Sequence, residues 1–149
     1  MTMQFDLSKE EKRALRVNKI KISDIPTLTC AQLLEVLSCD AQRAQCLIAS
    51  GTFQLIPSIG QKLAHTLVGL GFYQLDDLKM MDGATLFDEY EKKIGFRVDP
   101  CVEDQFRLVV YVANCGHADK QWWNFTRERK IFRNAYGYPE TRPTLSELE

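Results

Sequence analysis

The sequence predicts an all-α fold with a tandem helix-hairpin-helix core and additional C-terminal helices. Three observations lead to this prediction: no segment alternates like a β-strand, helix-capping residues recur along the chain, and one turn-like pattern occurs twice. The repeated pattern is isoleucine, proline, a hydroxyl residue and an aliphatic residue, at residues 25–28 and again 31 residues later at 56–59. We expect a single all-α domain over residues 1–149, in which residues 22–71 form the tandem region, residues 72–136 a C-terminal helical region and residues 137–149 a frayed tail.

The first half of the chain has clear helix start signals. Ser8 and Glu11 have the spacing of a capping box, which predicts a helix over residues 8–17. The first copy of the repeated turn then leads into a second helix. Asp40 is placed to cap a connector helix, and Gly51 has the character of the residue that follows a helix end.

The second half repeats these signals. The second copy of the turn leads into a helix that glycines at 69 and 71 end, and a short helix follows before residue 78. Asp82 predicts a helix that ends near Gly95, and Asp99-Pro100 is a typical helix start, with a capping residue followed by proline. Asn124 is expected to cap the last helix, which Gly137 stops.

Composition is typical of an ordinary globular protein. A chain of 149 residues can bury about two thirds of its unfolded surface, so it needs no disulfide or metal for stability. Its five cysteines have no paired spacing, and no apolar run approaches the length of a membrane span. We therefore expect a cytoplasmic protein with no cofactor, no metal and no membrane association.

Charge is unevenly distributed along the chain. The net charge of −1 and the pI near 6.1 argue against a protein that coats DNA avidly. Residues 1–21 nevertheless hold six basic and three acidic residues, and residues 118–142 hold the same numbers, so each end has a net charge of +3. These basic ends are either phosphate-binding surfaces or solvated helix faces.

The second copy of the turn is the main candidate for a phosphate-binding site. A sharp turn that ends at the start of a helix directs several unpaired backbone N–H groups at one point, where an anion can bind. Gly60 would let a phosphate approach closely, and Lys62 would add a charge-assisted contact. The predicted DNA contacts of this copy are Pro57, Ser58, Ile59, Gly60, Gln61 and Lys62.

Both copies depart from the usual helix-hairpin-helix pattern. Ser58 and Thr27 stand where the first hairpin glycine is usual, and Thr29 stands where the second copy has Gly60. A Cβ atom restricts positive φ and close backbone approach, so the first copy is the weaker candidate. Thr27 and Thr29 remain predicted contacts to a second phosphate.

A cluster of aromatic and basic residues lies near the C-terminus. The basic members Arg127, Arg129, Lys130 and Arg133 are candidate phosphate contacts. The neighbouring Trp122 and Trp123 either stack on unpaired bases or anchor the last helix to the core.

Cys101 is the one candidate for a reactive thiol. It lies in the first turn of a predicted helix, where the helix dipole lowers the pKa of a thiol. The two histidines, His65 and His117, have no recognisable catalytic context, and Cys115 with His117 supplies only one short pair of possible zinc ligands. We therefore expect no enzymatic activity, and a buried structural role is the alternative for Cys101.

Several motifs together resemble one small bacterial family. They are Ile-Pro-Ser-Ile-Gly at 56–60, Leu-Gly-Phe-Tyr-Gln-Leu-Asp-Asp-Leu-Lys at 70–79, Asp-Pro-Cys-Val at 99–102 with Arg107 further along the helix, and Trp-Trp-Asn-Phe at 122–125. The order of these motifs is similar to that of the pathogenicity-locus family of helix-hairpin-helix proteins, whose members are often labelled mitomycin-resistance proteins. The resemblance covers residues 52–125 and implies an all-α fold and DNA association. The paired hairpins also resemble, more distantly, the duplex-binding domains of bacterial Holliday-junction branch-migration proteins and excision nucleases.

The sequence therefore predicts a DNA-binding module that contacts the phosphate backbone without reading sequence, with a role in DNA repair or damage resistance and with no catalysis of its own. Binding through so few contacts is expected to be weak. The alternative is a protein-interaction or adaptor domain that keeps the hairpin as a scaffold, in line with the acidic pI. A third alternative is a thiol-dependent enzyme that uses Cys101. The oligomeric state does not follow from the sequence.

Overall fold

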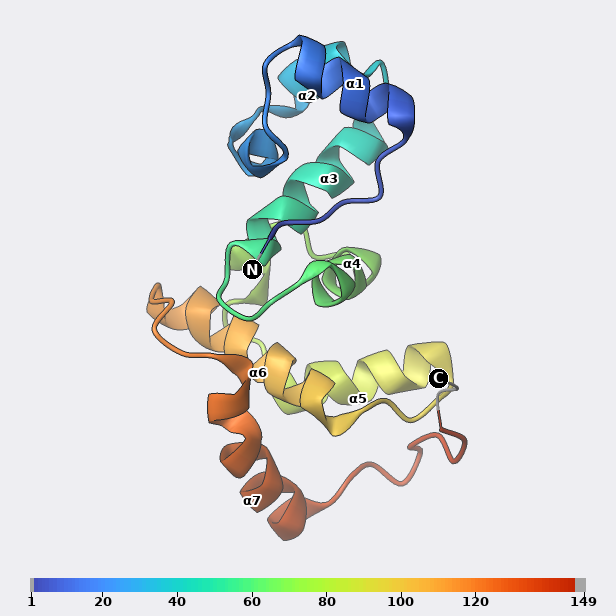
Figure 1. Cartoon of the computed structure of the whole chain (residues 1–149). Coiled ribbons are helices and arrows are strands. Elements are labelled where there is room, and N and C mark those ends of the chain that lie inside the picture. Colours follow the sequence, from blue (N-terminus) through green and yellow to red (C-terminus); the bar gives the residue numbers. More distant parts are fainter. Residues whose placement is uncertain (1, 147–149) are drawn as a thin grey trace. The chain divides into compact units, whose positions relative to one another are not determined.

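The computed structural model of the chain describes residues 2–146. These residues form helices and connecting segments, and no β-strand occurs among them (Figure 1). The all-α prediction is confirmed. The chain divides into two compact units, one ending at Asp77 and the other beginning at Leu78, where we had expected a single domain.

The first unit contains four α-helices and a 3-10 helix, and a second 3-10 helix lies at its boundary. These elements are α1 (Lys9–Val17), η1 (Ile22–Thr27), α2 (Cys30–Leu37), α3 (Ala41–Gln54), α4 (Gln61–Gly69) and η2 (Leu75–Leu78). Helices α1, α2 and α3 and the 3-10 helix η1 share a cluster of buried aliphatic residues: Leu15, Ile25, Leu33, Leu37, Ala44 and Leu47. Helices α1 and α4 lie at opposite ends of α3 (Figure 1).

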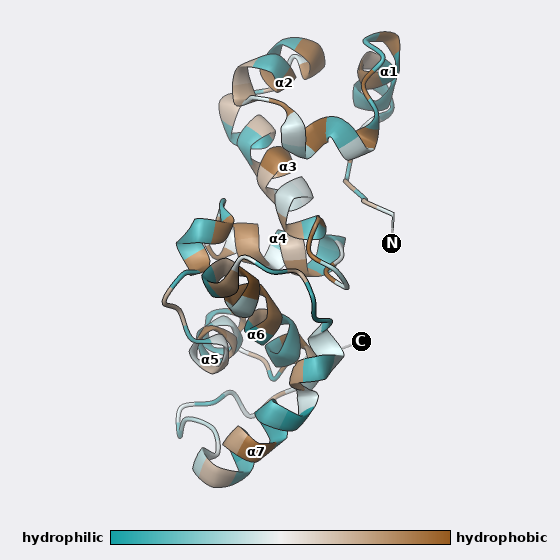
Figure 2. Ribbon diagram, turned by 90° about the vertical axis from the view of Figure 1, so that its left-hand side faces the viewer, coloured by the Kyte–Doolittle hydropathy of each residue, from teal (hydrophilic) through white to brown (hydrophobic). Residues whose placement is uncertain are grey.

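The second unit contains α5 (Gly83–Ile94), α6 (Pro100–Cys115), η3 (Trp122–Phe125) and α7 (Thr126–Tyr136). Helix α6 is hydrophobic along much of its length, whereas α7 is mostly hydrophilic (Figure 2). Phe106, Leu108 and Val109 of α6 are fully buried, so α6 forms the centre of this unit. At one crossing of α5 and α6, Gly83 lies directly against the backbone of Arg107.

The predicted helix starts are confirmed at four capping residues. Ser8 forms a reciprocal capping box with Glu11 at α1, and the Asp40 side chain accepts a hydrogen bond from the Arg43 N–H at α3. Asp82 and Asp99 cap α5 and α6 in the same way. These starts depend on contacts within three residues, which explains why the local sequence predicts them.

The predicted end of the third helix is wrong. Helix α3 continues through Gly51 to Gln54, so it is not a separate connector but leads directly into the second turn. Gly51 is buried in the helix, and a Cβ atom there would lie 2.7 Å from Cγ of Pro26. This glycine therefore allows η1 to approach α3 closely and does not end the helix.

Two predictions near the C-terminus also need correction. Asn124 does not cap α7; its side chain accepts a hydrogen bond from the Gln121 N–H and so caps η3. The predicted tail is not frayed over its described residues, 137–146. Arg142 pairs with Glu91 at 2.8 Å, and the Arg97 side chain donates a hydrogen bond to the Pro143 carbonyl. Residues 147–149 of the predicted tail lie outside the described residues.

Candidate nucleic-acid interface

The turn between α3 and α4 is held in place by two buried isoleucines. Ile56 and Ile59 are 6% and 0% exposed, and the Ile59 N–H donates to the Ile56 carbonyl at 3.1 Å. Between them, Ser58 adopts a φ of 65°, in the left-handed region that favours glycine. Ser58 therefore takes a backbone conformation that suits glycine, the residue usual at this place in the hairpin pattern that the sequence predicts.

The start of α4 has no side-chain cap. Gly60 is the N-cap residue in an extended conformation, and as a glycine it makes no side-chain hydrogen bond to the first-turn N–H groups. The first four N–H groups of a helix have no partner within the helix, and they carry the positive end of its dipole. Lys62 is exposed in this first turn. The turn and the start of α4 thus present amide donors and one cation at the same place.

The start of α2, in the first copy, differs because its own side chains cap it. The Thr29 hydroxyl accepts a hydrogen bond from the Gln32 N–H at 3.1 Å, and the Gln32 side chain accepts from the Thr29 N–H at 2.8 Å. Thr27 donates its hydroxyl proton to the Asp24 carbonyl at 2.6 Å. Thr27 and Thr29 are therefore engaged internally, and the first copy offers less to an anion than the second.

A groove of about 630 Å³ borders one side of α4 within the first unit. Gln61 and His65 line it from α4, and Gln42 lines it from α3. Gln42 donates a hydrogen bond from its amide nitrogen to the Tyr73 hydroxyl at 3.2 Å. Polar side chains thus line this groove from both helices, and Gln61 lies both beside the groove and at the start of α4.

Two of the predicted basic contacts are used inside the second unit. Arg129 pairs with Asp104 at 2.7 Å, and Arg133 pairs with Glu103 and Asp88, both at 2.9 Å. The side chains of Arg129 and Arg133 are only 11% and 7% exposed. This corrects the expectation that they meet a phosphate, because their guanidinium groups already neutralise buried carboxylates.

The other two predicted basic contacts of α7 remain on the surface. Arg127 and Lys130 are exposed, and Arg127 lines a groove of about 690 Å³ along α7. Trp123 is 55% exposed and packs edge-on against Trp122, with ring centroids 5.5 Å apart. Trp123 is therefore not a core residue, in contrast to the anchoring role that we had considered.

Buried carboxylates are the feature of the second unit that the sequence did not predict. Glu91, Glu103 and Asp104 are fully buried. Burial raises the cost of any unpaired charge, so each carboxylate meets an arginine. A signal was present, because Glu91 follows Ala84 and Phe87 at the spacing of one helix face.

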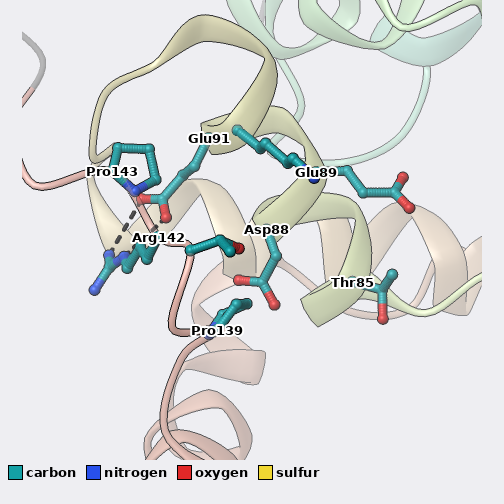
Figure 3. Close-up of a pocket in the computed structure, with 9 residues that line it drawn as sticks. Thr85, Asp88, Glu89, Glu91, Pro139, Arg142 and Pro143 are labelled. Carbon is teal, nitrogen blue, oxygen red and sulfur yellow. Dashed lines mark hydrogen bonds and ion pairs between the residues drawn. The ribbon is translucent and has the colours of Figure 1, made fainter.

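One of these pairs borders a pocket of about 230 Å³ between α5 and the C-terminal segment (Figure 3). Nε and Nη2 of Arg142 donate hydrogen bonds to the Glu91 carboxylate at 2.8 and 3.1 Å, and the Val98 N–H also donates to it at 2.8 Å. Asp88, in the same wall, is paired with Arg133. These groups satisfy one another, and they tie the C-terminal segment to α5.

Cys101 does not have the environment of a reactive thiol. Burial raises its pKa above the ordinary value, and the hydrogen bond with Asp99 and the negative charge of Asp99 raise it further. We had expected the helix dipole to lower this pKa, but the capping carboxylate of Asp99 lies at the same helix end. Among residues 2–146, no three histidine, cysteine or acidic side chains form a group suited to a metal ion.

We expect the alkylation rate of Cys101 to reach half its maximum above the ordinary thiol pKa of about 8.5, because the thiolate is disfavoured there. The measurement is iodoacetamide labelling across pH, with the modified cysteine identified by peptide mass. Labelling with a midpoint below pH 7 would contradict this expectation and return Cys101 to the candidates for a reactive thiol.

Within residues 2–146, no helix combines the length and the apolar character needed to cross a bilayer. A model of the family described as "Pathogenicity locus" matches residues 48–131, a range that includes the second turn, α4, α5, α6 and half of α7. The mitomycin resistance protein McrB of Streptomyces lavendulae is 27% identical over 90 residues, which cover 60% of this chain and 85% of that protein. No solved structure matches. Since the family model covers more than half of its residues, the chain belongs to the pathogenicity locus family.

Proposed function

We propose that the protein binds DNA through its phosphate backbone, with the turn at residues 56–60 and the start of α4 as the principal contact. The observation that carries the proposal is the φ of 65° at Ser58, which gives a serine the conformation that glycine has in a phosphate-binding hairpin. The uncapped first turn of α4 supplies the donors, and Lys62 supplies a charge. Binding of this kind recognises the backbone and not the bases.

The arrangement of the first unit supports a tandem helix-hairpin-helix interpretation. The two turns lie before α2 and α4, and α3 serves as the first helix of the second hairpin. In this interpretation the first hairpin is the weaker partner, because Thr29 and Gln32 cap α2. The name of the McrB relative supplies a biological context, and we propose a role in DNA repair or damage resistance, without catalysis by this chain.

The proposed contacts are the backbone N–H groups of residues 60–62 and the Lys62 ammonium, because the Ile59 N–H already donates to the Ile56 carbonyl. Exposed Arg127 and Lys130 are further candidates. A protein that neutralises about three phosphates should lose a few tens-fold in affinity when the salt concentration rises fourfold. Binding of this kind is weak and depends strongly on salt.

We expect Lys62→Glu to lower affinity for duplex DNA at least tenfold at low salt, because it replaces an attractive charge with a repulsive one beside the phosphate. The measurement is fluorescence anisotropy with labelled single-stranded, duplex and branched DNA at two salt concentrations. Lys92→Glu, the same charge change at an exposed position of the second unit, is the matched control and should have a much smaller effect. Ser58→Gly should retain binding, because glycine accepts the φ of this position.

The proposal fails if the protein binds none of these DNAs at low salt, or if Lys62→Glu binds as well as the original chain. Either result would also leave the start of α4 with a purely structural role.

A protein-interaction role is the second candidate, and exposed apolar side chains in the second unit favour it. Trp123, Ile131 and Tyr136 are 55%, 60% and 78% exposed, and Ile131 and Tyr136 line the groove along α7. Solvent exposure of side chains of this size is typical of surfaces that bind proteins. This candidate predicts a partner whose capture from a cell lysate survives nuclease treatment and is lost in Ile131→Glu.

A further inference from the structure

We propose that the outward face of α1 is a second DNA-backbone contact, formed by residues that have no part in the hairpin. This inference rests on the proposed function, because it adds a surface to the same DNA-binding unit. The proposed surface uses other residues than the hairpin does, and α1 lies outside the part of the chain that the family model matches.

The basic residues of α1 are gathered on one side of the helix. At about 100° per residue, Lys9, Lys12, Arg13 and Arg16 fall within a sector about 100° wide. All four side chains are exposed, whereas Leu15, which lies outside this sector, is 2% exposed and belongs to the core of the first unit. The four cations therefore form a stripe about 10 Å long that faces solvent.

Acidic residues near the stripe do little to offset this charge. Glu11 points away from the sector, where Arg43 of α3 binds its carboxylate through two nitrogens, at 2.6 and 2.7 Å. The hydrogen bond from Arg43 lowers the pKa of Glu11, so its charge is retained but matched. Glu10, the other carboxylate in α1, lies about 60° outside the sector.

The stripe continues past the end of the helix. Lys19 and Lys21 are both exposed, and Lys19 adopts a φ of 58° where it follows the helix. A side chain with a Cβ atom is disfavoured in this conformation, and glycine is the usual residue at such helix ends. A lysine at this position thus places a cation at the end of the stripe and accepts an unfavourable backbone conformation.

The chemistry of the stripe suits a phosphate backbone better than a lipid surface. Helices that lie on membranes insert large apolar side chains, and the basic sector of α1 contains none. The stripe belongs to the same compact unit as the second hairpin, and α3, which separates them, is about 21 Å long. That separation is shorter than one turn of a DNA duplex, which rises about 34 Å, so one duplex is long enough to reach both surfaces.

The test measures anisotropy of a labelled 20-base-pair duplex with the full chain over a series of salt concentrations. Lys12→Gln and Arg16→Gln keep the helix propensity, and each should weaken binding about threefold to tenfold and reduce the salt slope by about 0.9 for each phosphate that the variant no longer neutralises. Lys92→Gln, in the second unit, is the matched control and should leave both quantities unchanged. Lys19→Gly should weaken binding while the urea midpoint of unfolding stays equal or rises, since glycine relieves the positive φ.

The outcomes separate the inference from the proposed function. If Lys62→Glu weakens binding and the α1 variants do not, the hairpin proposal stands and the second surface is refuted. If Lys92→Gln weakens binding as much as the α1 variants, the effect is one of overall charge and the inference fails. If the original chain binds no duplex, both proposals fail, and an acidic protein becomes the partner to test for this stripe.

Discussion

We expect Arg133→Met to lower the free energy of unfolding by about 3 kcal/mol, because it removes one of the two arginines, Arg133 and Arg107, that neutralise the buried Glu103. Arg133 contacts the fully buried Glu103 and the partly buried Asp88, and its own side chain is 7% exposed. Burial alone would lower the pKa of Arg133, but the hydrogen bonds to these carboxylates outweigh it and raise the pKa. The measurement is urea unfolding followed by circular dichroism.

Two further variants make this test specific. Lys130→Met removes an exposed cation from the same helix and should change stability by no more than about 0.5 kcal/mol. Glu103→Gln and Arg133→Met together should cost less than the sum of the two single changes, since the two side chains bind each other. A loss below about 1 kcal/mol for Arg133→Met would show that Arg107, which binds Glu103 at 3.0 Å, neutralises the buried carboxylate by itself.

We also expect Gly83→Ala to destabilise the second unit by about 1–3 kcal/mol, although alanine normally favours a helix. A Cβ atom at Gly83 would lie 2.8 Å from Cα and 2.9 Å from the backbone nitrogen of Arg107. Backbone atoms cannot turn aside as a flexible side chain can, so α5 and α6 would have to move apart.

Gly69→Ala is the matched control, because nothing lies within 4 Å of the added atom at that helical position. It should be neutral or stabilise the protein by up to about 1 kcal/mol. Equal effects of the two substitutions, measured by thermal or urea unfolding, would contradict the close approach of α5 and α6.

The helix starts were predictable from sequence, whereas the end of α3 was not, because the two depend on contacts of different range. The caps at Ser8, Asp40 and Asp99 act on N–H groups no more than three residues away, so a short stretch of sequence contains the whole interaction. The reason for a glycine at position 51 is instead the close approach of Pro26, which lies 25 residues earlier. The local sequence does not distinguish a glycine that ends a helix from a glycine that allows another element to approach the helix closely.

The candidate site was predictable only in part. The position of the second turn follows from its proline and glycine, but the conformation of Ser58 depends on the burial of Ile56 and Ile59 on either side. The roles of Arg129 and Arg133 required knowledge of the carboxylates across the helix interface. Charge runs in sequence do not distinguish a cation that meets solvent from one that neutralises a buried acid.

The attachment of α7 has a consequence for the precision of this fold. None of its residues is buried, and it is joined to α6 by ion pairs at Arg129 and Arg133. An apolar helix face can slide along its neighbour and exchange one contact for a similar one. Here a shift of one helical turn, about 5.4 Å, would separate both guanidinium groups from their carboxylates at once. The charges therefore define a single register for α7, and the helix is either docked in that register or not docked.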